Sequence, residues 1–300
     1  MTGHRIAVGA AATPSVTESV SRTVGASVTE SVALARSVAL TRSETMARWT
    51  RPAPVDRVRP PDRLDVAVRR TGRYIPLGRV VSAPVRRGWL DVRTVGRDNV
   101  PVEGPVVLAA NHLAFIDSPL VMFGLDRPVV FLGKSEYLNN PVSRRLFPAV
   151  GMLPLDRSGR NSRITLDRVA AILDRGGAVG LHPEGTRSRD GRLHAGHTGV
   201  AQIALRAGAP IVPVALVGTA GAQPVGRLVP RFRSRIEIRY GAPIGIGPWA
   251  DNRRSARSRR ELTDEVMTAI AALSGQERAD SDSDAASPHA EAEAAGVTCG

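Results

Sequence analysis

The 300-residue chain has only one cysteine, Cys299, at its second-to-last position. A disulfide joins two cysteines, so the chain by itself cannot be a disulfide-stapled domain. A thiol in a polar tail is also a poor candidate for a catalytic nucleophile. This use of cysteine favours a reducing, intracellular setting.

Lysine and aromatic residues are also scarce. Lys134 is the only lysine, and Phe, Trp and Tyr together make up 4% of the chain, which leaves few rings on which single-stranded nucleic acid could stack. The formal net charge is +13; residues 274–300 hold one arginine and six acids, a net of −5, so the rest carries +18. A body this basic attracts anionic partners. We expect an anionic membrane surface or an acidic carrier protein rather than nucleic acid.

Long apolar runs are missing as well. No stretch approaches the roughly 18 apolar residues that cross a bilayer. The N-terminus also lacks the basic and apolar regions of a secretory signal. We therefore expect a cytoplasmic protein that reaches lipid from the side, as a peripheral protein on the inner face of the cell membrane.

The two ends of the chain have the composition of segments outside a folded domain. Residues 1–50 are rich in Ser, Thr, Val and Ala, and they contain the hexapeptide SVTESV twice. Valines at every fourth position would form the apolar stripe of a helix on a membrane surface. However, Val, Ser and Thr are poor helix formers, which favours a disordered leader. With the Pro/Arg linker at 51–63, this leader covers residues 1–72, and the acidic residues 274–300 form a disordered tail.

Between these ends, residues 73–273 alternate between strand and helix patterns. This alternation predicts a single α/β catalytic domain, with a largely parallel or mixed sheet flanked by helices. Strands are predicted at 89–94, 106–110, 129–132, 179–181, 211–217 and 236–240, and helices from 118 and at 161–175, 198–207 and 261–273. Ligands of such sheets bind outside the carboxyl ends of the strands. His112, Lys134 and Glu184 closely follow predicted strands, so we expect them at one rim.

The stretch Asn111-His-Leu-Ala-Phe-Ile-Asp117 directly follows an apolar run and places a histidine five residues before an aspartate. A helix would hold these two on different faces. Ser118 and Pro119 have the features of a helix N-cap and first turn, so the pair spans a loop. Such a loop can fold Asp117 onto the imidazole and fix its tautomer for general-base work. An aspartate that caps the helix beside an unrelated histidine fits the spacing equally well.

A second apolar run, about seventy residues later, ends in His182-Pro-Glu-Gly-Thr-Arg-Ser188. Gly185 allows a tight turn, and Arg187 offers a planar fork that matches phosphate oxygens. Thr186 adds a hydroxyl donor. Glu184 could accept a hydrogen bond from a substrate hydroxyl or support Arg187. An ordinary turn with a solvated arginine is the alternative.

With two further blocks, these motifs resemble the acylglycerolphosphate acyltransferase family, which makes phosphatidate from lysophosphatidate. That family has an NH-x4-D block, a Gly-to-Arg block ending in Asp-Arg, a Pro-Glu-Gly-Thr-Arg block and an apolar strand with a proline. The matching stretches, in the same order, are NHLAFID, Gly151-Met-Leu-Pro-Leu-Asp-Arg157, His182-Pro-Glu-Gly-Thr-Arg187 and Ile211-Val-Pro-Val-Ala215. The resemblance covers roughly residues 90–245, and it is more specific for the superfamily than for the acyl acceptor.

The resemblance implies that His112 is the general base and Asp117 its orienting partner. It assigns to the acceptor site Lys134, Arg157, Glu184, Gly185, Thr186 and Arg187. It also implies a lysophospholipid acceptor, acyl-CoA or acyl-carrier protein as the co-substrate, no other cofactor and no metal.

Three positions depart from the family pattern. Ala114 stands where serine is common, Pro154 where an apolar or aromatic residue is common, and His182 where an apolar residue precedes Pro-Glu-Gly. The His112/Asp117 pair is intact, so we expect a phosphatidate-forming acyltransferase. The alternatives are the same chemistry on another lysolipid or a glycolipid, and a catalytically inactive basic protein that binds lipid or nucleic acid.

Overall fold

The computed structural model describes residues 75–134, 141, 147–148, 150–155, 162–227 and 229–279. The leader and linker expected at 1–72 lie outside these residues. So do Arg157 and the end of the acidic tail.

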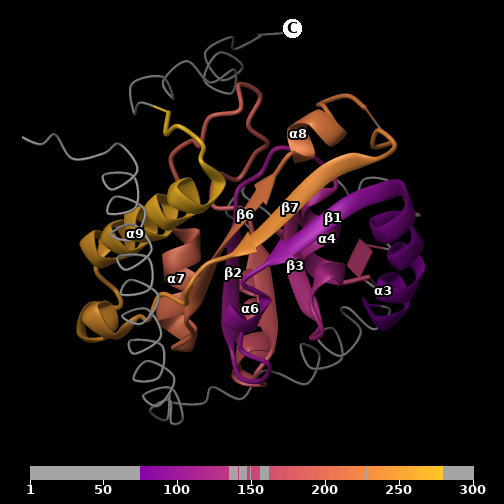
Figure 1. Cartoon of the computed structure of the whole chain (residues 1–300). Helices are drawn as coiled ribbons and strands as arrows, with labels where there is room; N and C mark the ends of the chain where they lie inside the picture. Colours follow the sequence, from indigo (N-terminus) through magenta and orange to yellow (C-terminus); the bar gives the residue numbers. More distant parts are fainter. Residues whose placement is uncertain are drawn as a thin grey trace, which may run out of the picture. The chain divides into compact units, whose positions relative to one another are not determined.

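A seven-stranded sheet forms the centre of the domain (Figure 1). The strands are β1 (Leu90–Val95), β2 (Val106–Ala110), β3 (Val129–Lys134), β4 (Met152–Leu155), β5 (Ala178–Leu181), β6 (Ile211–Val217) and β7 (Ser234–Tyr240). Their order in the sheet is β1-β7-β6-β2-β5-β3-β4. The pair β6–β7 is antiparallel and the other neighbours are parallel. The expected α/β fold with a largely parallel sheet is therefore confirmed.

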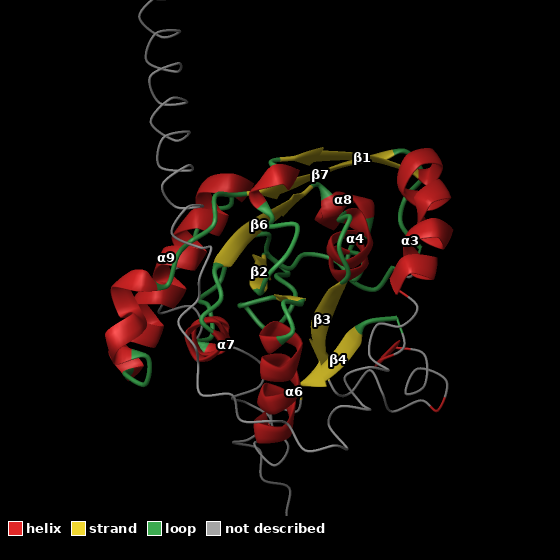
Figure 2. Cartoon of the chain, turned by 90° about the horizontal axis from the view of Figure 1, so that it is seen from below, coloured by secondary structure: helices red, strands yellow, loops and turns green. Residues whose placement is uncertain are grey.

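Helices cover both faces of the sheet, as the two views in Figures 1 and 2 show. One face carries α6 (Ser162–Asp174), α7 (Gly199–Ala207) and α9 (Ala256–Ser274). The other carries α3 (Ile75–Pro84), α4 (Asp117–Gly124) and the short α8 (Thr219–Ala222). Short helical turns are η1 (Val85–Trp89), η2 (Arg97–Asn99) and η4 (Gly247–Asn252). Each face of the sheet thus has its own apolar core.

Burial explains the two apolar patterns seen in the strands. All five residues of β2 and six of the seven in β6 are buried, because helices cover both faces of these central strands. Burial alternates in β7, where Ile236, Ile238 and Tyr240 face one core. Continuous and alternating apolar residues therefore predicted these strands correctly.

Some elements escaped the sequence patterns. Helix α9 begins at Ala256, five residues before the predicted start at 261. Ser255 caps it, because the Ser255 side chain accepts a hydrogen bond from the backbone N–H of Ser258. A run of arginines interrupts the apolar period there and hides the first turn. Strand β4 was not predicted, because Pro154 interrupts the apolar pattern of its four residues.

Residues 275–279 continue past α9 and bond to the loop around Leu193. The N–H of Leu193 donates to the C=O of Glu277 at 2.9 Å, and the N–H of Ala279 donates to the C=O of Leu193 at 2.9 Å. The side chain of Gln276 donates to the C=O of Gly191 at 2.8 Å. This differs from the expectation that the chain leaves the domain at residue 274.

One edge of the sheet gathers the predicted polar residues. Strands β2 and β5 are parallel neighbours, so the loops that start at Asn111 and His182 leave the sheet side by side. Strand β6, parallel to β2 on its other side, ends at the same edge. We call this the carboxyl edge. It is where ligands of parallel sheets bind.

Candidate active site

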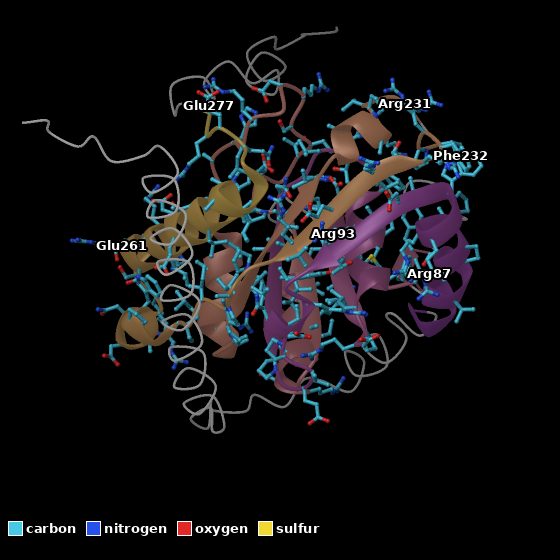
Figure 3. The ribbon with its side chains drawn as sticks, viewed as in Figure 1. Arg87, Arg93, Arg231, Phe232, Glu261 and Glu277 are labelled. Atoms are coloured by element: carbon cyan, nitrogen blue, oxygen red, sulfur yellow. The ribbon has the colours of Figure 1, made fainter. Side chains whose placement is uncertain are left out.

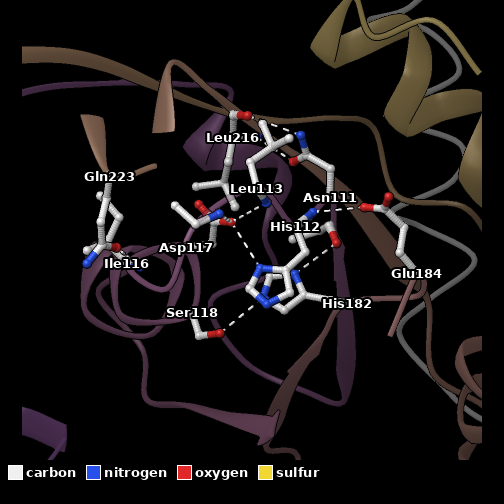
Figure 4. Close-up of polar contacts among 12 residues, drawn as sticks. Asn111, His112, Leu113, Ile116, Asp117, Ser118, His182, Glu184, Leu216 and Gln223 are labelled. Atoms are coloured by element: carbon white, nitrogen blue, oxygen red, sulfur yellow. Dashed lines mark hydrogen bonds and ion pairs between the residues drawn. The ribbon is translucent and has the colours of Figure 1, made fainter. Parts of the chain in front are cut away.

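The loop after β2 brings His112 and Asp117 together (Figure 4). His112 Nδ1 lies 3.0 Å from Asp117 Oδ2. An ionised carboxylate only accepts hydrogen bonds, so Nδ1 carries the proton and Nε2 carries the lone pair. The His112 side chain is 14% exposed, whereas that of Asp117 is fully buried. The contact that the spacing suggested is present, and it sets this tautomer of His112.

Asp117 also holds the loop on which His112 lies. Its Oδ2 accepts hydrogen bonds from the backbone N–H groups of Leu113, at 2.6 Å, and Ala114, at 2.7 Å. Burial raises the pKa of the Asp117 carboxyl, and these two N–H donors oppose that rise. Oδ2 thus receives from the protein the hydrogen bonds that water would otherwise provide.

Glu184 supports the backbone of His112. Its side chain is buried, and its two oxygens accept hydrogen bonds from the N–H groups of His112, at 2.9 Å, and His194, at 3.1 Å. The sequence suggested a substrate hydroxyl or Arg187 as the partner of Glu184, and the contacts found among the described residues are these two backbone N–H groups. Burial raises the pKa of Glu184 to about 7, against the effect of the two donors. The N–H of Ser188 also donates to the C=O of His112 at 2.8 Å, so the second motif holds His112 on both sides.

Asn111 joins this loop to β6, a role that the sequence analysis missed. Its side-chain Nδ2 donates to the C=O of Leu216 at 3.1 Å, and its Oδ1 accepts from the N–H of Leu216 at 2.7 Å. Nδ2 also donates to Gln276 Oε1 at 2.6 Å. A fully buried amide therefore continues the sheet pairing where the backbone of β2 turns away. The signal was the asparagine before the histidine, but its partner is 105 residues away.

His182 lies flat against His112, as the superposed rings in Figure 4 show. The ring centroids are 3.7 Å apart with an angle of 1° between the planes. His182 Nδ1 lies 3.0 Å from the C=O of Ala110, and Nε2 lies 3.0 Å from Ser118 Oγ. A carbonyl only accepts, so Nδ1 carries the proton and Nε2 accepts from the serine hydroxyl. Burial, followed by the neighbouring His112, lowers the pKa of His182 to about 3, which keeps this ring neutral.

The start of α4 differs from the predicted one. The helix begins at Asp117, and its N-cap residue, Ile116, makes no side-chain capping bond. Ser118, expected as the cap, instead contacts His182 with its hydroxyl. The first turn of α4 therefore provides one side chain to each of the two stacked histidines.

The expected phosphate-binding residues are described only in part. Gly185 has a φ of 71°, a left-handed conformation that favours glycine. Thr186 is exposed, and Arg187 is partly exposed without a hydrogen bond or ion pair to the described residues. Lys134 ends β3, a parallel neighbour of β5, and so lies at the carboxyl edge. Its side chain, like the whole of Arg157, lies outside the described part of the chain.

The described residues contain neither a metal-binding cluster nor a membrane-spanning helix. No group of three or more His, Cys, Asp or Glu side chains is placed to hold a metal ion there. No helix in that part of the chain has the length and apolar content needed to cross a bilayer.

The chain is similar to known acyltransferases. A family model described as Acyltransferase matches residues 91–217. The chain is 34% identical over 133 residues to a chloroplastic 1-acyl-sn-glycerol-3-phosphate acyltransferase, BAT2, of Brassica napus, covering 44% of the chain and 38% of that protein. It is 34% identical over 112 residues to the lyso-ornithine lipid O-acyltransferase of Pseudomonas aeruginosa, covering 37% and 43%. The chain thus spans about two fifths of the length of these relatives.

A solved structure has the same fold. The 1-acyl-sn-glycerophosphate (LPA) acyltransferase PlsC from Thermotoga maritima superposes with a TM-score of 0.51, covering 70% of this chain and 79% of that one. The two are 23% identical, so this likeness supports the fold alone.

Proposed function

The chain belongs, through residues 91–217, to the acyltransferase family, and from this premise we propose that it converts lysophosphatidate to phosphatidate. An acyl thioester provides the fatty acyl group, and the free hydroxyl of the acceptor receives it. The observation that carries the proposal is the His112/Asp117 contact at the carboxyl edge. It provides a general base without a serine nucleophile, as a reaction with a substrate hydroxyl requires.

His112 moves the proton in this mechanism. Its Nε2 takes the proton of the acceptor hydroxyl while the oxygen attacks the thioester carbonyl carbon. The imidazolium that forms is stabilised by Asp117 through Nδ1. The C–S bond then breaks, and His112 returns the proton to the leaving thiolate. Both substrates are bound together, and no acyl group is attached to the protein.

The phosphate of the acceptor binds at the HPEGTRS turn. Arg187 is the proposed anchor, because its guanidinium is partly exposed and has no partner among the described residues. Ser188, the next residue, bonds to the backbone of His112, so a phosphate at the turn lies near the base. Thr186, Lys134 and Arg157 are the further donors proposed from the family resemblance, whereas Glu184 supports the loop.

The donor and the location complete the proposal. The acyl donor is acyl-CoA or acyl-carrier protein, and the support for an anionic donor is the +13 net charge. The acceptor is a membrane lipid, so the protein works as a peripheral protein on the cytoplasmic face. No other cofactor takes part.

A second acceptor class has its own support. One relative is named for the acylation of lyso-ornithine lipid, at the same 34% identity as the Brassica napus enzyme. Lyso-ornithine lipid has no glycerol phosphate, and its acylation needs the same base. The base therefore does not distinguish the two functions, but the phosphate contacts do.

An acylation assay separates these functions. Purified protein is given a labelled acyl-CoA or acyl-carrier protein with lysophosphatidate, monoacylglycerol or lyso-ornithine lipid. We expect the highest kcat/KM with lysophosphatidate. His112→Ala lowers kcat by roughly 10²–10⁴, the usual contribution of a general base. His197→Ala, at an exposed histidine on a neighbouring loop, is the control.

Two results would contradict the proposal. Near-normal turnover of a folded His112→Ala variant would show that His112 is not the general base. A preference for lyso-ornithine lipid over lysophosphatidate would favour the second acceptor class.

A further inference from the structure

Exposed apolar and arginine side chains cluster beside the candidate active site. We call this cluster the aromatic–arginine surface; it comprises Trp89, Arg227, Val229, Arg231, Phe232 and Arg235, all exposed. Figure 3 shows Arg231 and Phe232 at the tip of the segment that precedes β7. Trp89 and Phe232 are 42% and 59% exposed, so two large rings face solvent in a chain with few aromatics.

Contacts within the surface fix its shape. The rings of Trp89 and Phe232 meet edge to face, with centroids 5.1 Å apart. The indole N–H of Trp89 donates to the C=O of Pro230 at 3.0 Å, and the N–H of Arg233 donates to the C=O of Trp89 at 2.7 Å. Arg233 has a φ of 57°, a strained conformation that turns the chain before β7. The turn that precedes β7 therefore holds the two rings at the surface.

Sheet topology places this surface at the carboxyl edge. Strand β7 is antiparallel to β6, so it begins at the edge where β6 ends. Strand β1 is parallel to β7, so Trp89, just before β1, lies at the same edge. Gln223 Oε1 accepts a hydrogen bond from the N–H of Ile116 at 2.9 Å. The surface and the His112 loop are thus parts of one rim.

The surface is basic as well as apolar. Segments 85–93 and 223–235 hold seven arginines against one acid, Asp91. In Figure 3 the labelled acids Glu261 and Glu277 lie on the α9 side, away from Arg231 and Phe232. Tryptophan rings lie at bilayer headgroups in membrane proteins, and clustered arginines are attracted to anionic leaflets. Charge and ring type together point to a lipid surface.

We propose that the aromatic–arginine surface docks on an anionic bilayer, with the two rings at headgroup depth and the arginines against lipid phosphates. This inference rests on the proposed function, because docking there sets the carboxyl edge, with His112, against the layer that contains the acceptor. The aromatic–arginine surface is then the part of the protein that contacts the bilayer.

Vesicle binding of the full chain tests the inference without turnover. Vesicles of phosphatidylcholine, with or without phosphatidylglycerol, are floated with wild type, Phe232→Ser and Arg231→Gln/Arg235→Gln. We expect binding only with phosphatidylglycerol, and about a twentyfold or greater loss for the double arginine variant. The matched controls are Val102→Ser, an exposed valine that precedes β2 at the opposite edge, and Arg254→Gln/Arg260→Gln, two exposed arginines near the start of α9.

The controls decide the outcome. Equal losses for the α9 pair would show that net charge, not this surface, binds the lipid. The inference would also be wrong if the Phe232 and arginine variants bound vesicles as wild type does. It would be wrong as well if these variants lost self-association of the chain and kept vesicle binding. Turnover on a short-chain acceptor dispersed in water should stay within twofold for every variant. If wild type lacks that turnover, the proposed function fails, whatever the vesicles show.

The ring of His182 contacts two other rings. His112 lies against one side at 3.7 Å, and Phe131 approaches at 4.7 Å with an angle of 49°. The bonds to Ala110 and Ser118 fix the plane of the ring at both nitrogens. A flat ring held in this way also fixes the plane of its neighbour.

We propose that His182 is a positioning residue that holds the imidazole of His112 in the plane of its contact with Asp117. His182→Leu removes the flat ring but keeps an apolar side chain, and His182→Phe keeps the ring. We expect kcat to fall about ten- to hundredfold in His182→Leu with KM nearly unchanged, since small misplacements of a reacting group have effects of this size. His182→Phe should restore most of the loss.

Two further variants serve as comparisons in this test. Ser118→Ala removes one of the two bonds to His182 and should lower kcat by a smaller factor, even if His182→Leu does not fold. His197→Leu, at an exposed histidine, should change nothing. An equal loss in the leucine and phenylalanine variants, a change in KM alone, or an unchanged kcat in Ser118→Ala would overturn the proposal.

Discussion

Asp117 and Glu184 are the two buried carboxylates beside His112, and they bond to different parts of it. Asp117 contacts the imidazole ring, whereas Glu184 contacts the backbone N–H. Asp117→Asn and Glu184→Gln therefore separate the orientation of the ring from the support of the loop.

Asp117→Asn should remove most of the turnover. An amide in place of the carboxylate can donate to Nδ1, which permits the wrong tautomer and leaves Nε2 protonated. We expect kcat to fall by roughly 10²–10⁴, with a similar circular dichroism spectrum. Steady-state kinetics measures this effect. A kcat within threefold of wild type would contradict the orienting role.

Arg187→Lys tests the proposed grip on phosphate. Lysine keeps the charge but lacks the planar fork, and a hydrogen bond to a charged group contributes roughly 1.5–3 kcal/mol. The kcat/KM for lysophosphatidate should therefore fall about ten- to hundredfold, while that for monoacylglycerol changes little. The measurement is the ratio of the two specificities. An equal loss on both acceptors would place Arg187 in the protein framework or at the acyl donor.

Stability should depend on pH through Glu184. Its pKa is raised to about 7 in the folded protein, from 4.5, so the folded state holds a proton that the unfolded state releases first. The free energy of unfolding therefore falls as pH rises from 4.5 to 7, by at most about 3 kcal/mol from this group. Denaturant titrations of wild type and Glu184→Gln, which cannot ionise there, give the difference. The free energy of unfolding of wild type minus that of Glu184→Gln should fall as pH rises. A constant value would show no coupling to Glu184, and a rising value would show the opposite sign.

At the scale of elements, the site is made by the loops after β2 and β5, with support from the segment after α9. Gln276 reaches Asn111, the residue before His112, and the backbone of residues 277–279 pairs with Leu193. These contacts connect the end of the described chain to the site.

Two truncations test this connection. A chain that ends at residue 274 loses the bonds of Gln276 and the pairing with Leu193, whereas one that ends at 279 keeps them. At about 1 kcal/mol for each hydrogen bond, the shorter chain should melt several degrees lower. Calorimetry of both truncations and the full chain measures this. Equal melting temperatures for the two truncations would show that residues 275–279 contribute nothing to stability.

The sequence predicted the elements better than their contacts. Apolar runs located β2, β5 and β6, and the five-residue spacing suggested the contact of His112 with Asp117. The bonds from Asn111 to Leu216 and from Glu184 to His112 span 105 and 72 residues. They depend on which strands are neighbours and on their register, and a local pattern carries neither.

At the scale of the whole molecule, one edge of the sheet brings together the candidate site and the aromatic–arginine surface. His112, the proposed phosphate anchor Arg187 and the aromatic–arginine surface lie where β2, β5 and β6 end and where β1 and β7 begin. Net charge alone predicted an anionic partner but not where that partner binds. The topology places the arginines of the aromatic–arginine surface at the carboxyl edge.

Strand β4 has a different consequence. It ends the sheet, has four residues, and includes Pro154, one of the departures from the family pattern. A proline offers no N–H to another strand, and a short edge strand of this kind is a poor template for addition. A strand from a neighbouring molecule therefore finds little to pair with at this end. Within the described sheet, Pro154 thus makes the β4 edge a poorer template for edge-to-edge aggregation.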